Sequence, residues 1–402
     1  MKLRRNLKIN MKTLRIVVFW MHLACGVALG VVVFIMCVTG VALTYEKQLL
    51  EWADRRAWTA SSPSDAQPLS PETLLARVEA AQAGTAPAGL TLRAERTAPA
   101  SVLFEGNTSL LVDPFTGVII GEPPPHLRSF FRTMTSWHRY LAMEGDARAT
   151  GKAVTGVSNL AFLFLVLSGM YLWVPRLWTW LQFKRVLWFR SGLSAKARDF
   201  NWHNVIGIWS AVPLAIVIAG AVPISYPWAS NLVYRLVGET PPAPAVGSSR
   251  GSQGGSERAS TTVVARGLDA AWATARSQIP GWRTMTTRLA TSERTPVVIT
   301  VDEGYGGQPD RRTTLTIARA RSTVSREETF ESLSAGRRLR SWLRFAHTGE
   351  MYGLPGQTIA GLATAGGAFL TYTGIALALR RLAAWIARRR TAAERFDEQQ
   401  AA

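Results

Sequence analysis

Four long apolar stretches interrupt an otherwise polar chain. A bilayer core of about 30 Å needs roughly 20 apolar residues in helical form. Stretches of this length are found at 16–44, 153–174, 205–226 and 358–379. The hydrophobic pattern therefore predicts an α-helical membrane protein with four transmembrane helices in contact with a lipid bilayer.

The first long segment between the apolar stretches, residues 46–152, has the pattern of a small α+β unit. Ser70 is a candidate N-cap, and Pro71 stands at the first helical turn. Runs with strand character follow at 90–93, 101–104, 109–112 and 118–120. The turn 113–117 contains Asp, Pro and Gly and joins the last two runs.

The second long segment, residues 227–356, has a similar pattern. It contains the Gly/Ser-rich residues 247–256, which predict a flexible linker. A helix is predicted near 261–278, and strands are predicted near 296–302 and 312–320. Together the two segments predict two small α+β domains outside the membrane.

Basic residues decide the orientation of the spans. The formal net charge is +19 and the pI is near 10.9, a balance that first suggests a nucleic-acid partner. The basic residues, however, cluster before the first apolar stretch, between the second and third, and after the fourth. Positive charge in such places marks the cytoplasmic side. We therefore expect no nucleic acid, both termini in the cytoplasm and both long segments outside.

This topology divides the chain into five parts. They are 1–45 (N-terminus and first span), 46–152 (first outer domain, with a histidine-bearing helix on the outer face), 153–226 (second and third spans with a basic loop), 227–356 (second outer domain) and 357–402 (fourth span and basic tail). The first apolar stretch lacks a small-residue cleavage site, which favours an uncleaved span. Cys25 and Cys37 are about 18 Å apart along one helix, too far for a disulfide between them.

The two halves of the chain resemble each other. His22 is followed by Gly26 and His203 by Gly207, at the same spacing. Near its far end each span carries a small residue followed by glycine, at Thr39-Gly40, Ser168-Gly169, Ala219-Gly220 and Thr373-Gly374. Both halves run through the membrane in the same direction, which predicts two parallel repeats of two helices. Small residues allow close helix approach and leave room for a flat cofactor.

Four of the five histidines occupy equivalent places in the two halves. His22 and His203 lie at the cytoplasmic side, near the start of the first span and just before the third. His138 and His347 precede the second and fourth spans on the outer side. Ionisable groups at membrane depth are costly and commonly functional, although a single such histidine is usually a satisfied polar residue. The symmetric placement favours paired ligation on each face. His126, in a Pro-rich loop, is expected to be solvated.

Paired histidines on two faces favour haem over zinc. Zinc binds four ligands close together, whereas the two pairs here are on opposite faces. Two histidines on facing helices suit the axial positions of a haem iron, and an iron without a vacant position passes electrons. Arg139 and Arg344, together with Arg132 and Arg340, lie near the outer histidines and are candidate partners of haem propionates. The alternative for these arginines is a solvated or lipid-phosphate-facing surface.

At these residues the chain resembles the PepSY-associated transmembrane family of bacterial inner-membrane proteins. The motifs that carry the resemblance are His22-x3-Gly26 with Thr39-Gly40, Trp137-His138-Arg139 with Ser168-Gly169 and Leu172-Trp173, Trp202-His203-Asn204 with Gly207, and His347-Thr348-Gly349. The turn Val112-Asp113-Pro114-x2-Gly117 looks like part of a PepSY domain, which the second outer segment matches loosely. The resemblance covers nearly the whole chain.

The resemblance implies a function in iron uptake. Members of the family include siderophore-iron reductases, so it implies two haem b groups and the reduction of a ferric siderophore in the periplasm, which releases Fe(II). The implied haem ligands are His22, His203, His138 and His347. No Gly-rich dinucleotide fingerprint follows a strand, so we expect an external electron donor, either a quinol or a cytoplasmic reductase.

Two other functions remain open at this point. One is a non-redox protein whose outer modules bind or regulate a partner and are tethered by the four helices. The other is a haem electron carrier with a different acceptor, such as cupric ion or a periplasmic protein. Haem content separates the first alternative from the rest, and acceptor tests separate the remaining two.

Overall fold

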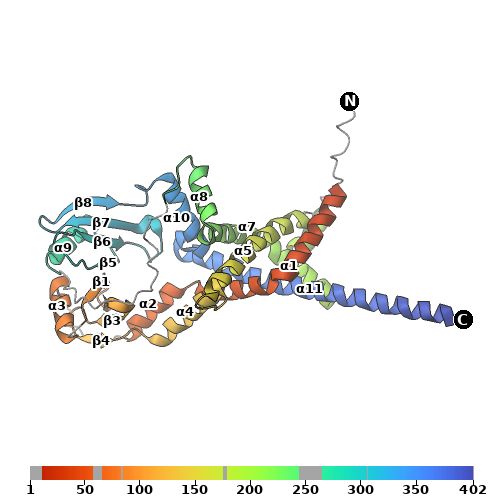
Figure 1. The fold of residues 1–402 in the computed structure, drawn as a ribbon, viewed down its shortest axis with the longest axis horizontal. Helices are drawn as coiled ribbons and strands as arrows, with labels where there is room; N and C mark the ends of the chain where they lie inside the picture. Colours follow the sequence, from red (N-terminus) through yellow and green to blue (C-terminus); the bar gives the residue numbers. More distant parts are fainter. Residues whose placement is uncertain are drawn as a thin grey trace, which may run out of the picture.

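The computed structural model describes residues 11–57, 66–82, 85–174, 179–243, 265–305 and 307–401. Two parts follow each other along the long axis of the molecule, a bundle of long helices and an antiparallel sheet with short helices (Figure 1). The start of the first helix and the end of the last lie away from the sheet. We call this the basic end of the bundle, and we call the other the sheet end.

Four helices in the described part of the chain are long and apolar enough to cross a membrane. They are α1 (Met11–Leu43), α5 (Ala147–Trp173), α7 (Ala195–Ser225) and α11 (Gly353–Ala401). Helices α1 and α7 each pack against both α5 and α11, which makes a four-helix bundle. Large apolar side chains such as Trp20, Val31 and Leu362 stay exposed on it, as expected of surfaces that face lipid. The four predicted spans are confirmed, and the chain is a multi-pass membrane protein.

Two of these helices extend beyond the apolar stretches that predicted them. Helix α7 begins at Ala195, so His203 lies inside the helix, in turns that precede the predicted apolar stretch. Helix α11 likewise continues past the predicted end at residue 379. The added turns of α7 are polar but packed, because Asp199 and Asn201 are buried and hydrogen-bonded.

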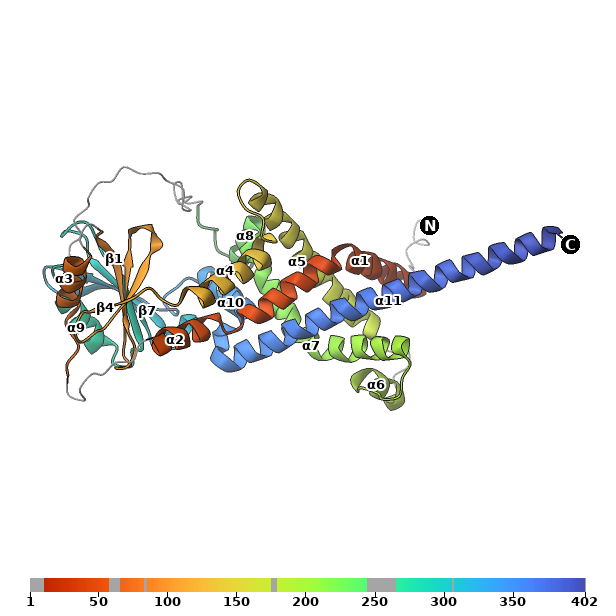
Figure 2. The ribbon, with the colours of Figure 1, turned by 90° about the horizontal axis from the view of Figure 1, so that it is seen from below.

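Shorter helices line the bundle. Helix α4 (Pro125–Tyr140) packs on α1 and α5, and α10 (Ala335–Thr348) packs on α7 and α8 (Pro227–Leu236). Helix α2 (Glu46–Ala57) follows α1 directly and leads towards the sheet, whereas α6 (Trp180–Leu187) lies at the basic end (Figure 2). His126, expected in a loop, is in the first turn of α4 with its side chain exposed.

The sheet has eight strands in the order β4-β3-β2-β1-β5-β6-β7-β8. The strands are β1 (Pro87–Arg93), β2 (Ala100–Phe104), β3 (Ser109–Val112), β4 (Ile119–Gly121), β5 (Thr284–Arg288), β6 (Val297–Asp302), β7 (Arg312–Ala318) and β8 (Thr323–Glu328). All neighbours are antiparallel. Each half of the chain supplies four consecutive strands, and β1 and β5 join the halves at the centre.

The two halves also share one hydrophobic core. Helices α3 (Pro71–Ala81) and α9 (Leu268–Gln278) lie next to each other against the sheet (Figure 2). Their buried side chains, among them Leu74 and Trp272, form a single cluster with strand residues of both halves. The division into two outer domains is therefore corrected: they are halves of one domain. A four-stranded unit alone would expose the backbone edge of β1 or β5, and pairing the two edges satisfies both.

The amino-terminal turns of α3 and α9 cap each other. The Asp269 carboxylate accepts a hydrogen bond from the Glu72 N–H at 2.8 Å, and the Glu72 carboxylate accepts one from the Asp269 N–H at 3.1 Å. Each helix thus places an acidic side chain at the positive end of the other helix dipole. This reciprocal contact fixes the two halves of the outer domain in a symmetric arrangement.

In the outer domain, the helix cap and most of the strands predicted from the sequence are found in the structure. The Ser70 N-cap is confirmed, because its hydroxyl accepts from the Thr73 N–H. Strands β1 to β4, β6 and β7 match the predicted runs within a few residues. Strands β5 and β8 were not predicted, since Thr, Arg and Glu dominate them and little hydrophobic alternation is visible. The predicted linker 247–256 and the predicted helix start near 261 lie outside the described residues.

The single sheet can be tested by a disulfide across its centre. Thr91 on β1 and Thr286 on β5 are directly paired, and their hydroxyl oxygens are 3.0 Å apart, so cysteines there fall within disulfide reach. In a background without Cys25 and Cys37, we expect Thr91→Cys with Thr286→Cys to cross-link on mild oxidation, seen as a mobility shift under non-reducing conditions. The control combines Thr91→Cys with Thr300→Cys, one strand further away, and should not cross-link. Two independent domains would give no link in either variant.

Candidate functional site

The bundle brings the four histidines together as two opposed pairs. At the basic end, the rings of His22 on α1 and His203 on α7 have centroids 6.5 Å apart. At the sheet end, the rings of His138 on α4 and His347 on α10 have centroids 6.2 Å apart. Each pair takes one histidine from each half of the chain, as the topology of the sequence predicts.

Each histidine is held through its Nδ1 atom by a helix of its own half. At the basic end, His22 Nδ1 is 2.8 Å from the Ser168 hydroxyl, and His203 Nδ1 is 2.9 Å from the Thr373 hydroxyl. Both hydroxyls donate their proton to a carbonyl one turn earlier in their helix. They therefore accept from the imidazole, and Nδ1 carries the proton.

The sheet-end pair is held by backbone carbonyls. His138 Nδ1 donates to the Met36 carbonyl at 2.9 Å and also lies 3.1 Å from the Thr39 hydroxyl, and His347 Nδ1 donates to the Val217 carbonyl at 2.8 Å. With the proton on Nδ1 in all four rings, Nε2 carries the lone pair. A fixed tautomer of this kind is what an orienting partner gives a metal-binding histidine.

The small-residue pairs seen in the sequence are the surfaces on which the histidines rest. A Cβ added to Gly40 would lie 3.3 Å from the His138 ring, and one added to Gly169 would lie 3.4 Å from the His22 ring. At Gly374 the same atom would be 3.5 Å from the His203 ring. At Gly220 it would be 2.4 Å from the Leu343 carbonyl and 3.1 Å from His347 Cβ, so α10 could not pack there. A Cβ at Gly220 would therefore block α10 and one at Gly40 would crowd His138, whereas at Gly169 and Gly374 the ring lies at an ordinary contact distance.

The sheet-end imidazoles are neutral at physiological pH. Burial lowers the pKa of His138 to about 4, and it also lowers the pKa of His347. The rings nevertheless keep part of their surface accessible. A neutral ring with an accessible face retains the nitrogen lone pair that a metal ion requires.

The separation within each pair fits a metal ion held between two imidazoles. Metal–imidazole bonds are about 2 Å long, so two coaxial imidazoles on one ion would have ring centroids about 6 Å apart. Both observed separations are close to this value. No group of three or more His, Cys, Asp or Glu side chains suited to a metal occurs among the described residues. Each pair therefore presents two opposed imidazoles at a separation that would fit the two protein ligands of a haem iron.

The two pairs lie at different depths of the bundle. His22 and Thr39, which contacts His138, are 17 residues apart on α1, about 26 Å along a helix. His203 and Gly220, which lies against His347, are also 17 residues apart, on α7. The two positions are therefore near opposite sides of a hydrocarbon layer of about 30 Å.

The arginines predicted beside the outer histidines differ in their surroundings. Arg344 lies one helical turn before His347 and, with Arg337 and Arg340, lines a basic cavity of about 360 Å³. Arg139 is exposed and stacks over the Tyr140 ring at 5.2 Å. Neither has an acidic partner within the described residues. His126 is in neither pair, in agreement with its expected solvated position.

A charged cluster that sequence reasoning missed joins two helices at the basic end. Asp199 on α7 is 2% exposed and forms ion pairs with Arg198, at 3.1 Å, and with Arg380 on α11. Asp199 is one turn before His203, and Arg380 is two turns after Thr373. The ion pair therefore ties the helix that bears the histidine to the helix that orients it. Its signal in the sequence is an acid within a basic segment beside a predicted span.

A four-helix membrane protein with opposed imidazoles at two depths is the class that this geometry defines. Residues 19–381, nearly the whole chain, match the family model for the PepSY-associated TM region. The chain belongs to this family. A comparison with curated proteins finds no match.

Removing Arg380 should weaken the basic end of the bundle. Arg380→Ala takes one partner from a buried carboxylate, but Arg198 still faces it, so we expect a loss of about 2 kcal/mol, less than for a fully orphaned buried charge. The melting temperature in detergent, followed by tryptophan fluorescence, should fall by several degrees. Arg388→Ala, exposed on the same helix, is the matched control. Equal melting temperatures for both variants would contradict a structural role of the Asp199 ion pair.

Proposed function

We propose that the protein is a di-haem transmembrane electron carrier that reduces a ferric siderophore outside the inner membrane of a bacterium. The observation that carries the proposal is the pair of opposed, Nδ1-anchored imidazoles at each end of the bundle. In this proposal His22 with His203, and His138 with His347, are the axial ligands of two haem b groups. Each haem, when bound, supplies an iron that cycles between Fe(III) and Fe(II).

The residues around the histidines would favour electron transfer over oxygen or substrate chemistry. When a haem is bound, the two histidines of a pair would leave its iron without a vacant coordination site. Ser168 and Thr373 fix the ring planes at the basic end, and Met36 and Val217 fix them at the sheet end. Fixed ligands limit the rearrangement that accompanies a change of charge, which is the main protein contribution to such a centre.

Cationic partners for haem propionates are available at the sheet end. Arg344 faces a cavity lined by several arginines, and Arg340 in the same helix donates to the Ser230 hydroxyl at 2.7 Å. Arg139 is adjacent to His138 and exposed. Charge-assisted bonds from these guanidinium groups would orient a propionate and draw the macrocycle to the outer face of the bundle.

The choice of a ferric siderophore as the electron acceptor rests on the resemblance to the family. Siderophore oxygens are hard ligands that hold Fe(III), and one electron converts the metal to Fe(II), which these oxygens hold weakly. The electron would come from a quinol or a cytoplasmic reductase at the basic end and leave towards the domain formed by the sheet. This reaction is that of a ferric-siderophore reductase. A bundle that lacks haem would instead favour a non-redox tethered binding protein.

Loss of one basic-end ligand should remove one haem and leave the other. We expect two low-spin b-type haems per chain in the purified wild type and one in His203→Ala, measured by a reduced-minus-oxidised spectrum and by haem extracted per chain. His126→Ala removes an exposed histidine outside both pairs and should keep two haems. A His203→Ala protein with two low-spin haems would overturn the ligand assignment.

Loss of a sheet-end ligand should leave reduction of the basic-end haem intact but slow the transfer of its electron to the acceptor. In His347→Ala the basic-end haem remains, about 26 Å of helix away from the sheet end. We expect dithionite to reduce this haem, and reoxidation by an added ferric siderophore to slow by at least roughly a hundredfold, as followed by stopped-flow absorbance. His126→Ala again serves as the control. Reoxidation at the wild-type rate in His347→Ala would contradict an electron path through the sheet-end pair.

A further inference from the structure

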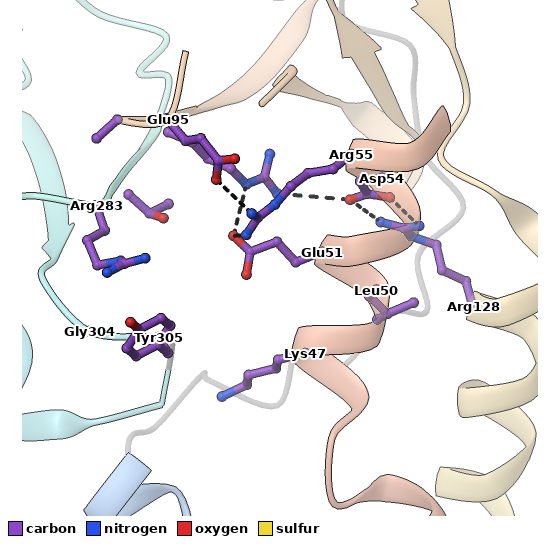
Figure 3. Close-up of a pocket in the computed structure, with 13 residues that line it drawn as sticks. Lys47, Leu50, Glu51, Asp54, Arg55, Glu95, Arg128, Arg283, Gly304 and Tyr305 are labelled. Carbon is purple, nitrogen blue, oxygen red and sulfur yellow. Dashed lines mark hydrogen bonds and ion pairs between the residues drawn. The ribbon is translucent and has the colours of Figure 1, made fainter. Parts of the chain in front are cut away.

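A cavity of about 560 Å³ lies where the outer domain meets the sheet end of the bundle. Helix α2 forms one wall, and the end of β1, the start of β5 and the loop after β6 form the other (Figure 3). Its volume is in the range of small-molecule sites. This cavity could not be predicted from the sequence, because its lining comes from both halves of the chain.

The acidic side chains of the cavity are already neutralised. Asp54 on α2 is 2.8 Å from Arg128 on α4. Arg55 bridges Glu51, at 3.0 Å, and Glu95, at 2.7 Å. These contacts, drawn in Figure 3, fix α2 against β1 and α4. The acids therefore shape the wall of the cavity and attract no further cation.

The opposite wall carries positive charge that no acid neutralises. The guanidinium of Arg283 lies over the Tyr305 ring at 4.1 Å, and no acidic side chain pairs with Arg283 in the described part of the chain. Figure 3 shows both side chains on the wall that faces Glu51. Five basic and three acidic side chains line the cavity in all. Lys47 is paired with Glu350 just outside the cavity, so the surplus is the one positive charge of Arg283. Its place beside an aromatic ring suits an anion with a planar aromatic group.

The cavity is also close to the sheet-end histidines. Arg128, in its wall, is ten residues before His138 on the same helix, about 15 Å along the helix axis. Lys47, also in the wall, forms an ion pair at 2.7 Å with Glu350, three residues after His347. Helix α4, which bears His138, therefore reaches the cavity directly, and the turn that follows α10 reaches it through the Lys47–Glu350 ion pair.

We propose that this cavity binds the acceptor as an anionic ferric complex of the tricatecholate class, and that Arg283 and Tyr305 select it by charge and ring stacking. The proposal rests on the proposed function, since it identifies the substrate class of that electron carrier. A haem held by His138 and His347 would supply the single electron that converts the Fe(III) of the bound complex to Fe(II). Cationic ferric complexes are disfavoured by the same surplus of positive charge.

The test uses gallium complexes, because Ga(III) matches Fe(III) in charge and ligand preference and accepts no electron. The full-length protein in detergent is titrated with the trianionic Ga(III) complex of a hexadentate tricatecholate, followed by calorimetry. We expect saturable one-site binding to the wild type and roughly tenfold or weaker binding to Arg283→Glu. Arg288→Glu, exposed at the end of β5 and outside the cavity, should bind like the wild type. The cationic Ga(III) complex of an amine-bearing trihydroxamate should bind the wild type more weakly.

The outcomes separate this inference from the function on which it rests. Equal binding by Arg283→Glu and Arg288→Glu, or stronger binding of the cationic complex, would overturn the inference even if ferric complexes reoxidise the haems. Selective gallium binding in a protein that holds no haem would support the cavity and overturn the electron carrier. Binding that needs Arg283, together with reoxidation by the matching ferric complex, would support both.

Discussion

The rest of the structure depends on burying four imidazoles between membrane helices without leaving their polar nitrogens unsatisfied. Each ring must come close enough to another helix to donate from Nδ1, and at each such approach the neighbouring helix presents glycine beside a small residue. The glycine pairs therefore set where the spans cross. They also leave the second nitrogen of each ring with its lone pair available. Helix packing and metal-binding capacity thus have the same cause in this bundle.

The outer domain, like the helix bundle, is built from two similar halves of the chain. Four strands and one helix from each half meet at β1 and β5, and the helices cap each other through Glu72 and Asp269. Each histidine pair likewise takes one member from each half. Helix α2 and the ion pairs of Asp54 connect the outer domain with the bundle. A displacement of the sheet would be transmitted to α4, and through α4 to His138.

Much of this architecture is visible in the sequence, for identifiable reasons. Apolar stretches longer than 20 residues have few alternatives to a membrane span, and the repeated histidine and glycine spacing predicts which histidines face each other. The sequence could not predict the fusion of two outer units into one sheet, because β5 is a short run of Thr and Arg whose partner strand is almost 200 residues away. It also missed the first turns of α7, where polar residues such as Asp199 are buried by ion pairs formed only in the folded bundle. The cavity beside Arg283 was invisible for the same reason, since its walls are assembled from distant segments.

The half of the chain that supplies each histidine's hydrogen-bond partner has a consequence for the order in which the protein assembles in the membrane. Every histidine finds its Nδ1 partner within its own half, whereas the opposing ring comes from the other half. The first half can therefore enter the bilayer with its imidazoles already hydrogen-bonded, and it can wait there while the ribosome completes the second. Neither pair exists until the second half has been inserted. A chain interrupted at its midpoint would have its Nδ1 atoms hydrogen-bonded, but each imidazole would lack the opposing ring that completes its pair.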